Sequence, residues 1–324
     1  MTYVTSKQIN QLREISPGRI ARNPENPRLV FRQEEMDTLL RSIKKFGIQV
    51  PITVYEQDGE FVLIDGERRW RCARKLNLQK IPALVQPKPT DLNNLLLMFN
   101  IHALREQWDY LTIASKLPKI IELFAADNDN RNPNEIELSE LTGLTRGQIR
   151  RCHLLLDLPE EYRSLLFDEL DLPKQKQRLS EDFFIEMERS LKTVEKRIPT
   201  AFSDINVARD ALIKKYRDKV INNVVDLRKI SKIATSILSL GVAPEKAQSA
   251  LEQIFDPSNR IGITAVFEEQ FETRYDEQKI VRNIESITNF LEEIETGDLI
   301  EEQSPEIKDL LHRLSAALNR MLRG

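Results

Sequence analysis

The spacing of apolar residues predicts a mixed α/β segment at the start of the chain. A first helix is indicated by apolar residues that recur every three or four positions: Met36, Leu39, Leu40, Ile43 and Phe46. Gly47 follows, where a left-handed residue would end this helix. Residues 51–64, PITVYEQDGEFVLI, then predict two strands joined by the Asp58-Gly59 turn.

A second helix and a third strand complete this unit. ERRWRCARKL, residues 67–76, has Trp70, Ala73 and Leu76 on one side, and IPALVQ, residues 81–86, reads as a strand. We therefore predict a compact α+β unit over residues 16–90, within a first domain of residues 1–90.

Beyond Thr90, a plausible helix cap, the apolar pattern indicates helices alone. Pro118 predicts a kink or a break in the helical pattern of residues 108–126, and the polar segment 171–180 predicts a linker or domain edge. The fold class is thus an α+β domain followed by helices, predominantly helical overall. The predicted boundaries place a helical domain at residues 91–175 and a helical carboxy-terminal region at residues 176–324.

Two short heptad patterns occur in the last helical region. Their apolar positions are Ile280, Ile284, Ile287, Leu291 and Ile294, then Ile307, Leu311, Leu314, Leu318 and Met321. Each pattern spans about two heptads, fewer than the three or four that define a coiled coil. An antiparallel helical hairpin, a dimer seam and ordinary packing in a helical bundle all remain open.

Composition restricts the function classes. The 324 residues carry a formal net charge of −3, and no apolar run approaches the roughly 20 residues that cross a bilayer. The first residues lack the apolar core of a signal peptide, so a cytoplasmic protein without membrane contact is expected. Cys72 and Cys152 have no metal-binding or redox spacing, and three histidines far apart give no zinc signature.

One stretch is strongly basic in an otherwise slightly acidic protein. In LIDGERRWRCARKL, residues 63–76, Gly66 lies between a predicted strand and a helix whose first turn contains Arg68 and Arg69. A helix amino terminus exposes unpaired N–H groups, glycine allows close approach, and arginine forks suit phosphate oxygens. The stretch predicts a polyphosphate site, and a solvated basic helix face is the plainer alternative.

The order of several motifs resembles the amino-terminal domain of ParB-type chromosome and plasmid partition proteins, over about residues 15–175. The motifs are NPENPR, FGIQVPI, DGERRWRCARKL and IPALV. The resemblance implies a ParB/sulfiredoxin-like domain that binds CTP, or another nucleoside triphosphate, with Mg²⁺. It places Gly47, Gln49 and Pro51 on the base side, and the phosphates beside Gly66, Glu67, Arg68 and Arg69.

A second phosphate motif of that family is altered in FNIHALRE. Asn100 matches the family's asparagine and is predicted to contact the nucleotide and the metal. Phe99 stands where an acidic residue would be, His102 and Ala103 replace glutamine and arginine, and Arg105 follows two residues later. Because a carboxylate there would help to hold Mg²⁺, we expect nucleotide binding more than hydrolysis, and CTPase activity stays open.

LSELTGLTRGQIRRCHLL has the spacing of a helix-turn-helix within residues 134–156. Ser139 is small where the helices cross, Gly143 supplies the turn, and Ile149 would fill the core between the helices. Thr145 and Gln148 form a capping-box pattern, which predicts that the second helix begins at Thr145.

This start would place DNA-contacting residues on the exposed side of the second helix: Thr145, Arg146, Gln148, Arg150 and Arg151. Arginine reads guanine and glutamine reads adenine through paired hydrogen bonds, whereas Arg151 suits a phosphate. The alternative is a helical pair in a bundle with solvated arginines.

Together these features predict a site-specific binder of double-stranded DNA, associated with the nucleoid or a plasmid and acting in chromosome, plasmid or mobile-element partitioning. The resemblance further implies a homodimeric clamp switched by nucleotide, and possible contact with a partition ATPase. One rival is an enzyme of the same fold, a nuclease or a small-molecule kinase with Asp65, Glu67 or Glu106 as base. A scaffold that uses the heptad patterns is the other.

Overall fold

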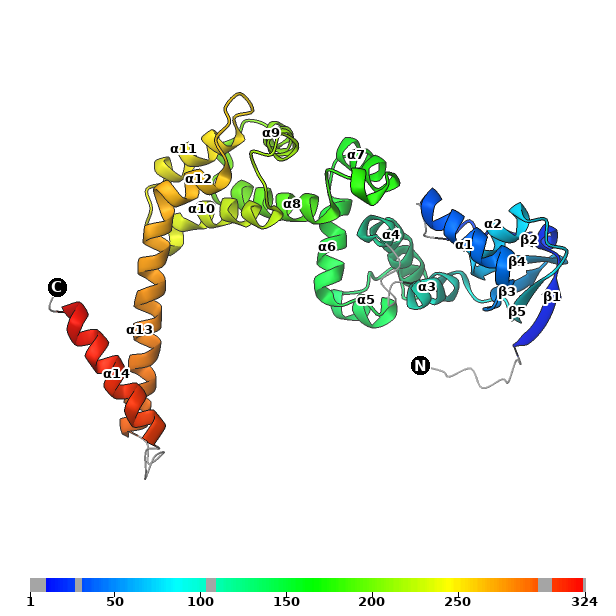
Figure 1. Ribbon diagram of the computed structural model, residues 1–324, viewed down its shortest axis with the longest axis horizontal. Coiled ribbons are helices and arrows are strands. Elements are labelled where there is room, and N and C mark those ends of the chain that lie inside the picture. The colour runs from blue at the N-terminus through cyan, green and yellow to red at the C-terminus, as the bar shows by residue number, and fades with distance from the viewer. Residues whose placement is uncertain (1–9, 27–30, 103–108, 297–304, 323–324) are drawn as a thin grey trace.

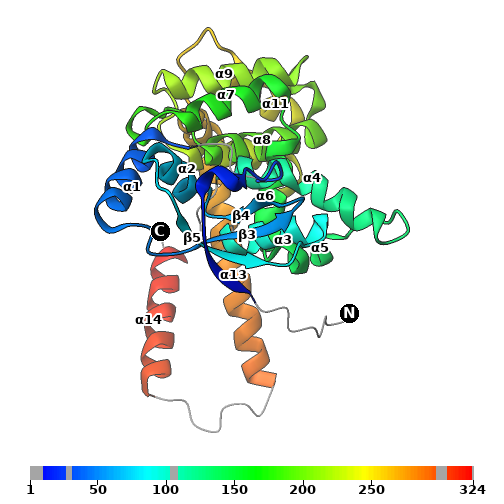
Figure 2. The same cartoon turned by 90° about the vertical axis from the view of Figure 1, so that its right-hand side faces the viewer.

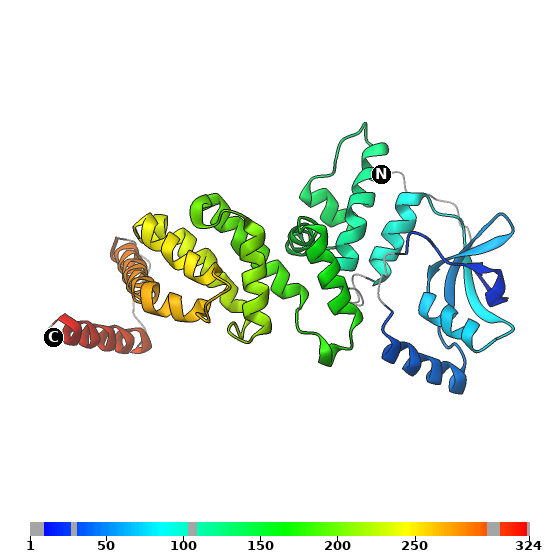
Figure 3. The ribbon, with the colours of Figure 1, turned by 90° about the horizontal axis from the view of Figure 1, so that it is seen from above.

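The computed structural model describes residues 10–26, 31–102, 109–296 and 305–322. A small mixed sheet with its helices lies at one end, shorter helices fill the middle, and two long helices extend from the other end (Figure 1; Figure 3). The predicted α+β start and helical remainder are therefore confirmed.

The sheet contains five strands in the order β1-β5-β3-β4-β2. Their bounds are β1 (Gln11–Ile15), β2 (Ile20–Ala21), β3 (Ile52–Gln57), β4 (Glu60–Asp65) and β5 (Ile81–Gln86). The predicted hairpin of β3 and β4 is confirmed, with φ of 53° at Asp58 and 81° at Gly59, as a tight hairpin turn requires. The two edge strands β1 and β2 were not predicted from the apolar pattern.

Helices α2 (Glu67–Lys75) and α3 (Asp91–His102) pack on the sheet, and α1 (Gln33–Phe46) packs on α2. Successive strand residues point to opposite faces of a sheet. Val54 and Leu63 accordingly join an apolar core with Trp70 of α2. Their neighbours Tyr55 and Ile64 join a second core that contains α3 and the later helices.

Four helices form the middle of the molecule: α4 (Tyr110–Ala126), α5 (Glu135–Thr142), α6 (Arg146–Leu156) and α7 (Glu160–Asp171). Helix α4 is one continuous element that contains Pro118, so the predicted break does not occur there. The expected cap at Thr90 is confirmed, because its hydroxyl accepts a bond from the Asn93 N–H at 3.2 Å.

The predicted linker 171–180 is exposed over residues 171–176, and its last part is held against α7. The Glu169 carboxylate accepts bonds from the N–H groups of Arg178 and Leu179 at 2.7 and 3.3 Å, and Leu179 is buried. The core that begins at Tyr55 continues into the next helices: α8 (Glu181–Arg197), α9 (Ile205–Arg217), α10 (Leu227–Ser239), α11 (Pro244–Phe255) and α12 (Ile263–Phe267). The boundary at residue 175 stays a prediction.

A π-helical turn over residues 268–272 connects α12 to α13 (Thr273–Thr296), and α14 (Pro305–Leu322) follows. Both helices extend away from the helical body (Figure 2). Ile280, Ile284 and Ile287 are 50%, 47% and 42% exposed, so these positions do not form a bundle core within this chain. Among the described helices, none combines the length and apolar character needed to cross a bilayer.

Glu181, the first residue of α8, caps the start of α4. Its Oε1 accepts a bond from the Leu111 N–H at 2.7 Å, and the side chain of the N-cap residue Asp109 makes no capping bond. Burial raises the pKa of the Glu181 carboxyl to about 7, although the bond from Leu111 acts in the opposite direction.

Gly66 fixes the turn between β4 and α2. Its φ of +95° lies in the left-handed region, and a Cβ atom added there would lie 2.6 Å from Cγ2 of Ile52. Any other residue would therefore meet both backbone strain and a steric clash with the sheet.

Gly66→Ala is expected to lower the free energy of unfolding by about 2–4 kcal/mol, because strain and overpacking add. Urea denaturation followed by circular dichroism measures the loss. Gly59→Ala is the matched control, since Gly59 has a φ of +81° and nothing within 4 Å of the added Cβ. Equal losses in the two variants would contradict the role of the Ile52 contact.

The raised pKa of Glu181 also predicts a pH dependence. The folded state binds this proton more tightly than the unfolded state, whose pKa is near 4.5. The protonated Glu181 carboxyl therefore stabilises the folded state fully below about pH 4.5, and this stabilisation is lost as the pH rises to about 7. Glu181→Gln keeps an oxygen for the Leu111 N–H and should remove this slope, with a gain of ~1–3 kcal/mol at about pH 8.

Urea denaturation at about pH 5 and about pH 8 tests this expectation. Glu245→Gln is the control, because Glu245 occupies the first turn of α11 and is exposed. A Glu181→Gln variant with the same pH slope as the wild type would show that the carboxyl does not titrate in this range.

Candidate functional site

The buried carboxylate of Glu67 organises the start of α2. Its side chain is only 3% exposed and receives the Arg71 guanidinium, with Nε and Nη2 at 2.9 and 2.6 Å from Oε1. Arg22 Nε lies 3.1 Å from the same oxygen, and the Asn26 amide donates to Oε2. The Glu67 side chain is thus turned toward these donors, and its backbone N–H belongs to the first turn of the helix.

The loop that carries NPENPR is connected to two further helices. Asn23 is buried and its amide donates to Oδ1 of Asn94 on α3 at 3.3 Å. Glu25 pairs with Lys116 on α4 at 3.4 Å. Sequence reasoning assigned no role to these polar residues, and the turn-rich run between prolines was the signal that could have drawn attention to them.

Arg69 joins the two turns that were predicted to bind one nucleotide. Its guanidinium donates to the carbonyl oxygens of Val50 and Pro51, the latter at 2.8 Å, and to the Asp65 carboxylate at 2.9 Å. The turn after α1 is therefore held directly against the turn before α2. The structure brings the predicted base-side and phosphate-side residues together through a side chain that was assigned only to phosphate.

The base-side residues form the end of α1. Gly47 has a φ of +71° and donates its N–H to the Ile43 carbonyl at 2.9 Å, which confirms the predicted helix end. The exposed Gln49 amide donates to the Phe46 carbonyl. Pro51 is partly buried beside Arg69. Contact between any of these residues and a base stays a prediction.

The phosphate-side turn is the start of α2. Its N-cap residue is Gly66, which has no side chain to cap the helix, and the first-turn amides of a helix have no intrahelical partner. Arg68 is partly exposed and is held by a longer ion pair, 3.4 Å to Glu35. These amides and the Arg68 guanidinium are the groups of this turn that suit an anion.

The second phosphate motif lies largely outside the described residues. Asn100 belongs to α3, but its side chain lies outside the described part of the structure, as do residues 103–108. Phe99 is completely buried in the larger core. Within the described residues, no group of three or more histidine, cysteine or acidic side chains could hold a metal ion.

The helix-turn-helix is confirmed in its local geometry. Gly143 ends α5 with a φ of +73° and donates its N–H to the Ser139 carbonyl. Helix α6 begins after Thr145, whose hydroxyl accepts from the Gln148 N–H at 3.2 Å, while the Thr145 N–H donates to the Gln148 side chain at 2.8 Å. Ile149 is buried between the helices as predicted.

The predicted DNA-contacting arginines fall into two environments. Arg146 and Arg150 lie one turn apart on α6, are 55% and 62% exposed, and both pair with Glu135 of α5. Arg151 is 26% exposed, stacks on the Tyr110 ring with its guanidinium carbon 4.6 Å from the ring centre, and pairs with Asp182. The structure therefore brings Arg146 and Arg150 together and turns Arg151 toward the protein body.

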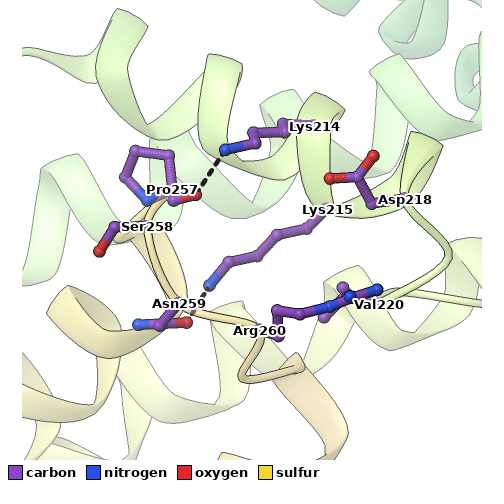
Figure 4. A pocket seen from close by; sticks show the side chains of 8 residues that line it. All are labelled: Lys214, Lys215, Asp218, Val220, Pro257, Ser258, Asn259 and Arg260. Atoms are coloured by element: carbon purple, nitrogen blue, oxygen red, sulfur yellow. Dashed lines mark hydrogen bonds between the residues drawn. The ribbon is translucent and has the colours of Figure 1, made fainter.

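A cavity of about 380 Å³ lies at the end of α9, away from these motifs (Figure 4). Lys215 crosses it, and its ammonium donates to Ile254 O and Asn259 Oδ1 at 2.7 and 2.9 Å, with two further carbonyl oxygens near 3.1–3.2 Å. Burial lowers the pKa of Lys215 to about 8. Because these oxygens accept the hydrogen bonds of the ammonium, Lys215 connects the end of α11 to the loop that follows it.

Comparisons with known proteins agree with these motifs. The profile of a family described as the ParB N-terminal domain matches residues 1–100. The probable chromosome-partitioning protein ParB of Campylobacter jejuni is 32% identical over 171 residues, which cover 51% of this chain and 58% of that protein. The shared region thus spans little more than half of that relative.

Two other proteins are similar over different lengths. The nucleoid occlusion protein of Geobacillus sp. (strain WCH70) is 26% identical over 270 residues, 78% of this chain and 90% of that protein. The crystal structure of the C-terminally truncated chromosome-partitioning protein ParB from Caulobacter crescentus complexed with CTP-gamma-S is 25% identical. Its match covers 55% of this chain and 92% of that chain, with a TM-score of 0.29.

The family profile covers the sheet, α1, α2 and the two turns that Arg69 joins. The similarity to the Geobacillus protein is longer than the α+β domain and must continue into the helical part. Residues 1–100 of the chain therefore match the ParB N-terminal domain, and a helix-turn-helix follows them in the structure.

Proposed function

We propose that this protein is a DNA-binding partition protein that holds a nucleoside triphosphate at the β4–α2 turn and contacts DNA through α6. One observation carries the proposal: the amino terminus of α2 begins at a left-handed glycine, Gly66, directly beside the turn after α1. Such a terminus attracts phosphate through its free amides and its partial positive charge.

The nucleotide would be held by groups of two kinds. The first-turn amides of α2 and the Arg68 guanidinium suit the phosphates, and the turn of residues 47–51 would face the base. The resemblance favours CTP, with a magnesium ion bound largely by phosphate oxygens and by Asn100. Bound Mg²⁺ would neutralise phosphate charge, and hydrolysis stays an open question because Phe99 replaces the acidic residue.

The DNA would be contacted by the exposed face of α6. Arg146 and Arg150 supply positive charge there, and the names of the relatives support chromosome partitioning or nucleoid occlusion as the process. Arg151 would reach a phosphate only after leaving Tyr110 and Asp182, so we assign it a supporting role. A nucleotide-switched clamp and contact with a partition ATPase extend this proposal.

A homodimer fits the carboxy-terminal helices. The stripe of Ile280, Ile284 and Ile287 on α13 is substantially exposed in one chain, and heptad spacing suits a second helix. A two-fold dimer would place two α6 helices on DNA and would require a site with two-fold symmetry.

The enzyme alternative is less well supported. A kinase would need Asp65, Glu67 or Glu106 as a free base beside the phosphates, and Glu106 lies outside the described residues. Glu67 is buried and accepts bonds from three side chains, and Asp65 accepts a bond from Arg69. Neither carboxylate is poised to take a proton from a substrate in this arrangement.

Arg68→Ala is expected to raise the dissociation constant for CTP by at least about tenfold, because a charged donor to phosphate is lost, while the free energy of unfolding stays nearly unchanged. Titration with labelled CTP, ATP and GTP, each with and without Mg²⁺, measures this. Arg74→Ala, at the other end of α2, is the matched control.

Arg69→Ala should weaken nucleotide binding and also lower the free energy of unfolding by ~1–3 kcal/mol, since carbonyl oxygens and a carboxylate lose a charged donor. A wild-type protein that binds no triphosphate under any of these conditions would refute the nucleotide site.

Arg150→Ala is expected to weaken DNA binding for all sequences and to reduce the slope of log affinity against log salt by about one unit. Retention of duplex DNA across a salt series gives the slope. Arg282→Ala on α13 removes the same charge from an exposed position outside the helix-turn-helix. An unchanged slope would show that Arg150 does not contact phosphate.

A further inference from the structure

We propose that Glu135 determines the specificity of the DNA interface: its carboxylate orients Arg146 to read guanine and opposes binding to phosphate alone. The inference rests on the proposed DNA-binding function of α6. It assigns a role to an acidic residue that sequence reasoning did not consider.

The carboxylate of Glu135 is shared by two guanidinium groups. Oε1 lies 2.5 Å from Nε of Arg146 and 2.9 Å from Nη2 of Arg150, and Oε2 lies 2.9 Å from Nε of Arg150. Glu135 is 32% exposed and is the first residue of α5. The three side chains therefore form one cluster at the surface where the first turns of α5 and α6 meet.

The carboxylate of Glu135 binds the two arginines through different sets of nitrogens. Arg146 is held through Nε, which leaves both terminal nitrogens, Nη1 and Nη2, available as a pair of donors. That pair matches the O6 and N7 acceptors of guanine in the major groove. Arg150 commits Nε and Nη2 to the carboxylate, so its paired edge is occupied and its outward donors suit a single phosphate oxygen.

Gln148 is less suited to base reading than its position on α6 indicates. Its side-chain oxygen accepts bonds from the N–H and the hydroxyl of Thr145. Paired recognition of adenine needs both the oxygen and the nitrogen of the amide, so it would break the capping box. Direct reading from this part of α6 therefore falls to Arg146.

The negative charge of Glu135 also separates specific from non-specific binding. Non-specific affinity comes almost entirely from phosphates, and a phosphate approaching Arg146 or Arg150 meets a carboxylate within 2.9 Å of both. A guanine edge is neutral and meets much less repulsion. The bonds from Arg150 and Arg146 lower the pKa of the Glu135 carboxyl, and the helix terminus favours its charged form.

Glu135→Gln tests both consequences in the full-length protein. Binding is measured on a duplex library with a randomised core and on poly(dA-dT), which lacks the guanine edge, as the non-specific duplex. We expect about three- to tenfold tighter binding to poly(dA-dT), a steeper salt dependence, and guanine enrichment in selected duplexes reduced by at least about tenfold. Glu140→Gln makes the same charge change at an exposed position on α5 and should match the wild type.

Arg146→Lys provides an independent arm. Lysine keeps the charge but lacks the planar fork, so this variant should bind poly(dA-dT) nearly as the wild type does and lose guanine enrichment. Circular dichroism on each variant confirms folding before binding is compared.

The outcomes separate the two proposals. A wild type that selects sequences, together with a Glu135→Gln variant that selects them equally, overturns the role of Glu135 and leaves DNA binding intact. Retained guanine enrichment in Arg146→Lys overturns the assignment of the reading residue. A wild type that retains no duplex DNA even at low salt refutes the proposed function, and this inference with it.

Discussion

The buried carboxylate of Glu67 is the interaction on which the candidate nucleotide site depends. A charge that is 3% exposed needs close partners, and Arg22, Asn26 and Arg71 supply them from two separate segments. Removing one partner of a buried pair leaves an uncompensated charge at a cost of several kcal/mol. This requirement holds the loop after β2 against the first turn of α2.

The density of arginine in α2 has mainly structural causes. Arg69 connects two turns, and Arg74 lies over the Trp70 ring. Arg71 pairs with Glu67 and stacks on Phe31, with its guanidinium carbon 3.9 Å from the ring centre. Arg68 is the arginine of the first turn with the weaker attachment, 3.4 Å to Glu35. A count of basic residues therefore overstates how much positive charge this stretch offers to a ligand.

Local sequence patterns predicted local structure well, but they could not predict contacts between residues that are distant in the sequence. The Asp58-Gly59 turn, the end of α1 and the capping box at Thr145 each depend on residues a few positions apart. Strands β1 and β2 are defined by their partners in the sheet, and β1 exposes Leu12, so alternation was weak. The orientation of Arg151 depends on Tyr110 and Asp182, which are distant in sequence and close only after folding.

The hairpin of β3 and β4 belongs to two cores at once. Val54 and Leu63 pack under α2, whereas the adjacent Tyr55 and Ile64 pack with the helical part of the chain. A slip of one residue in strand pairing would exchange these two sets of side chains. Strand register thus also sets the docking of the sheet onto the helices, so an error made while the hairpin forms would misplace the β4–α2 turn relative to α6.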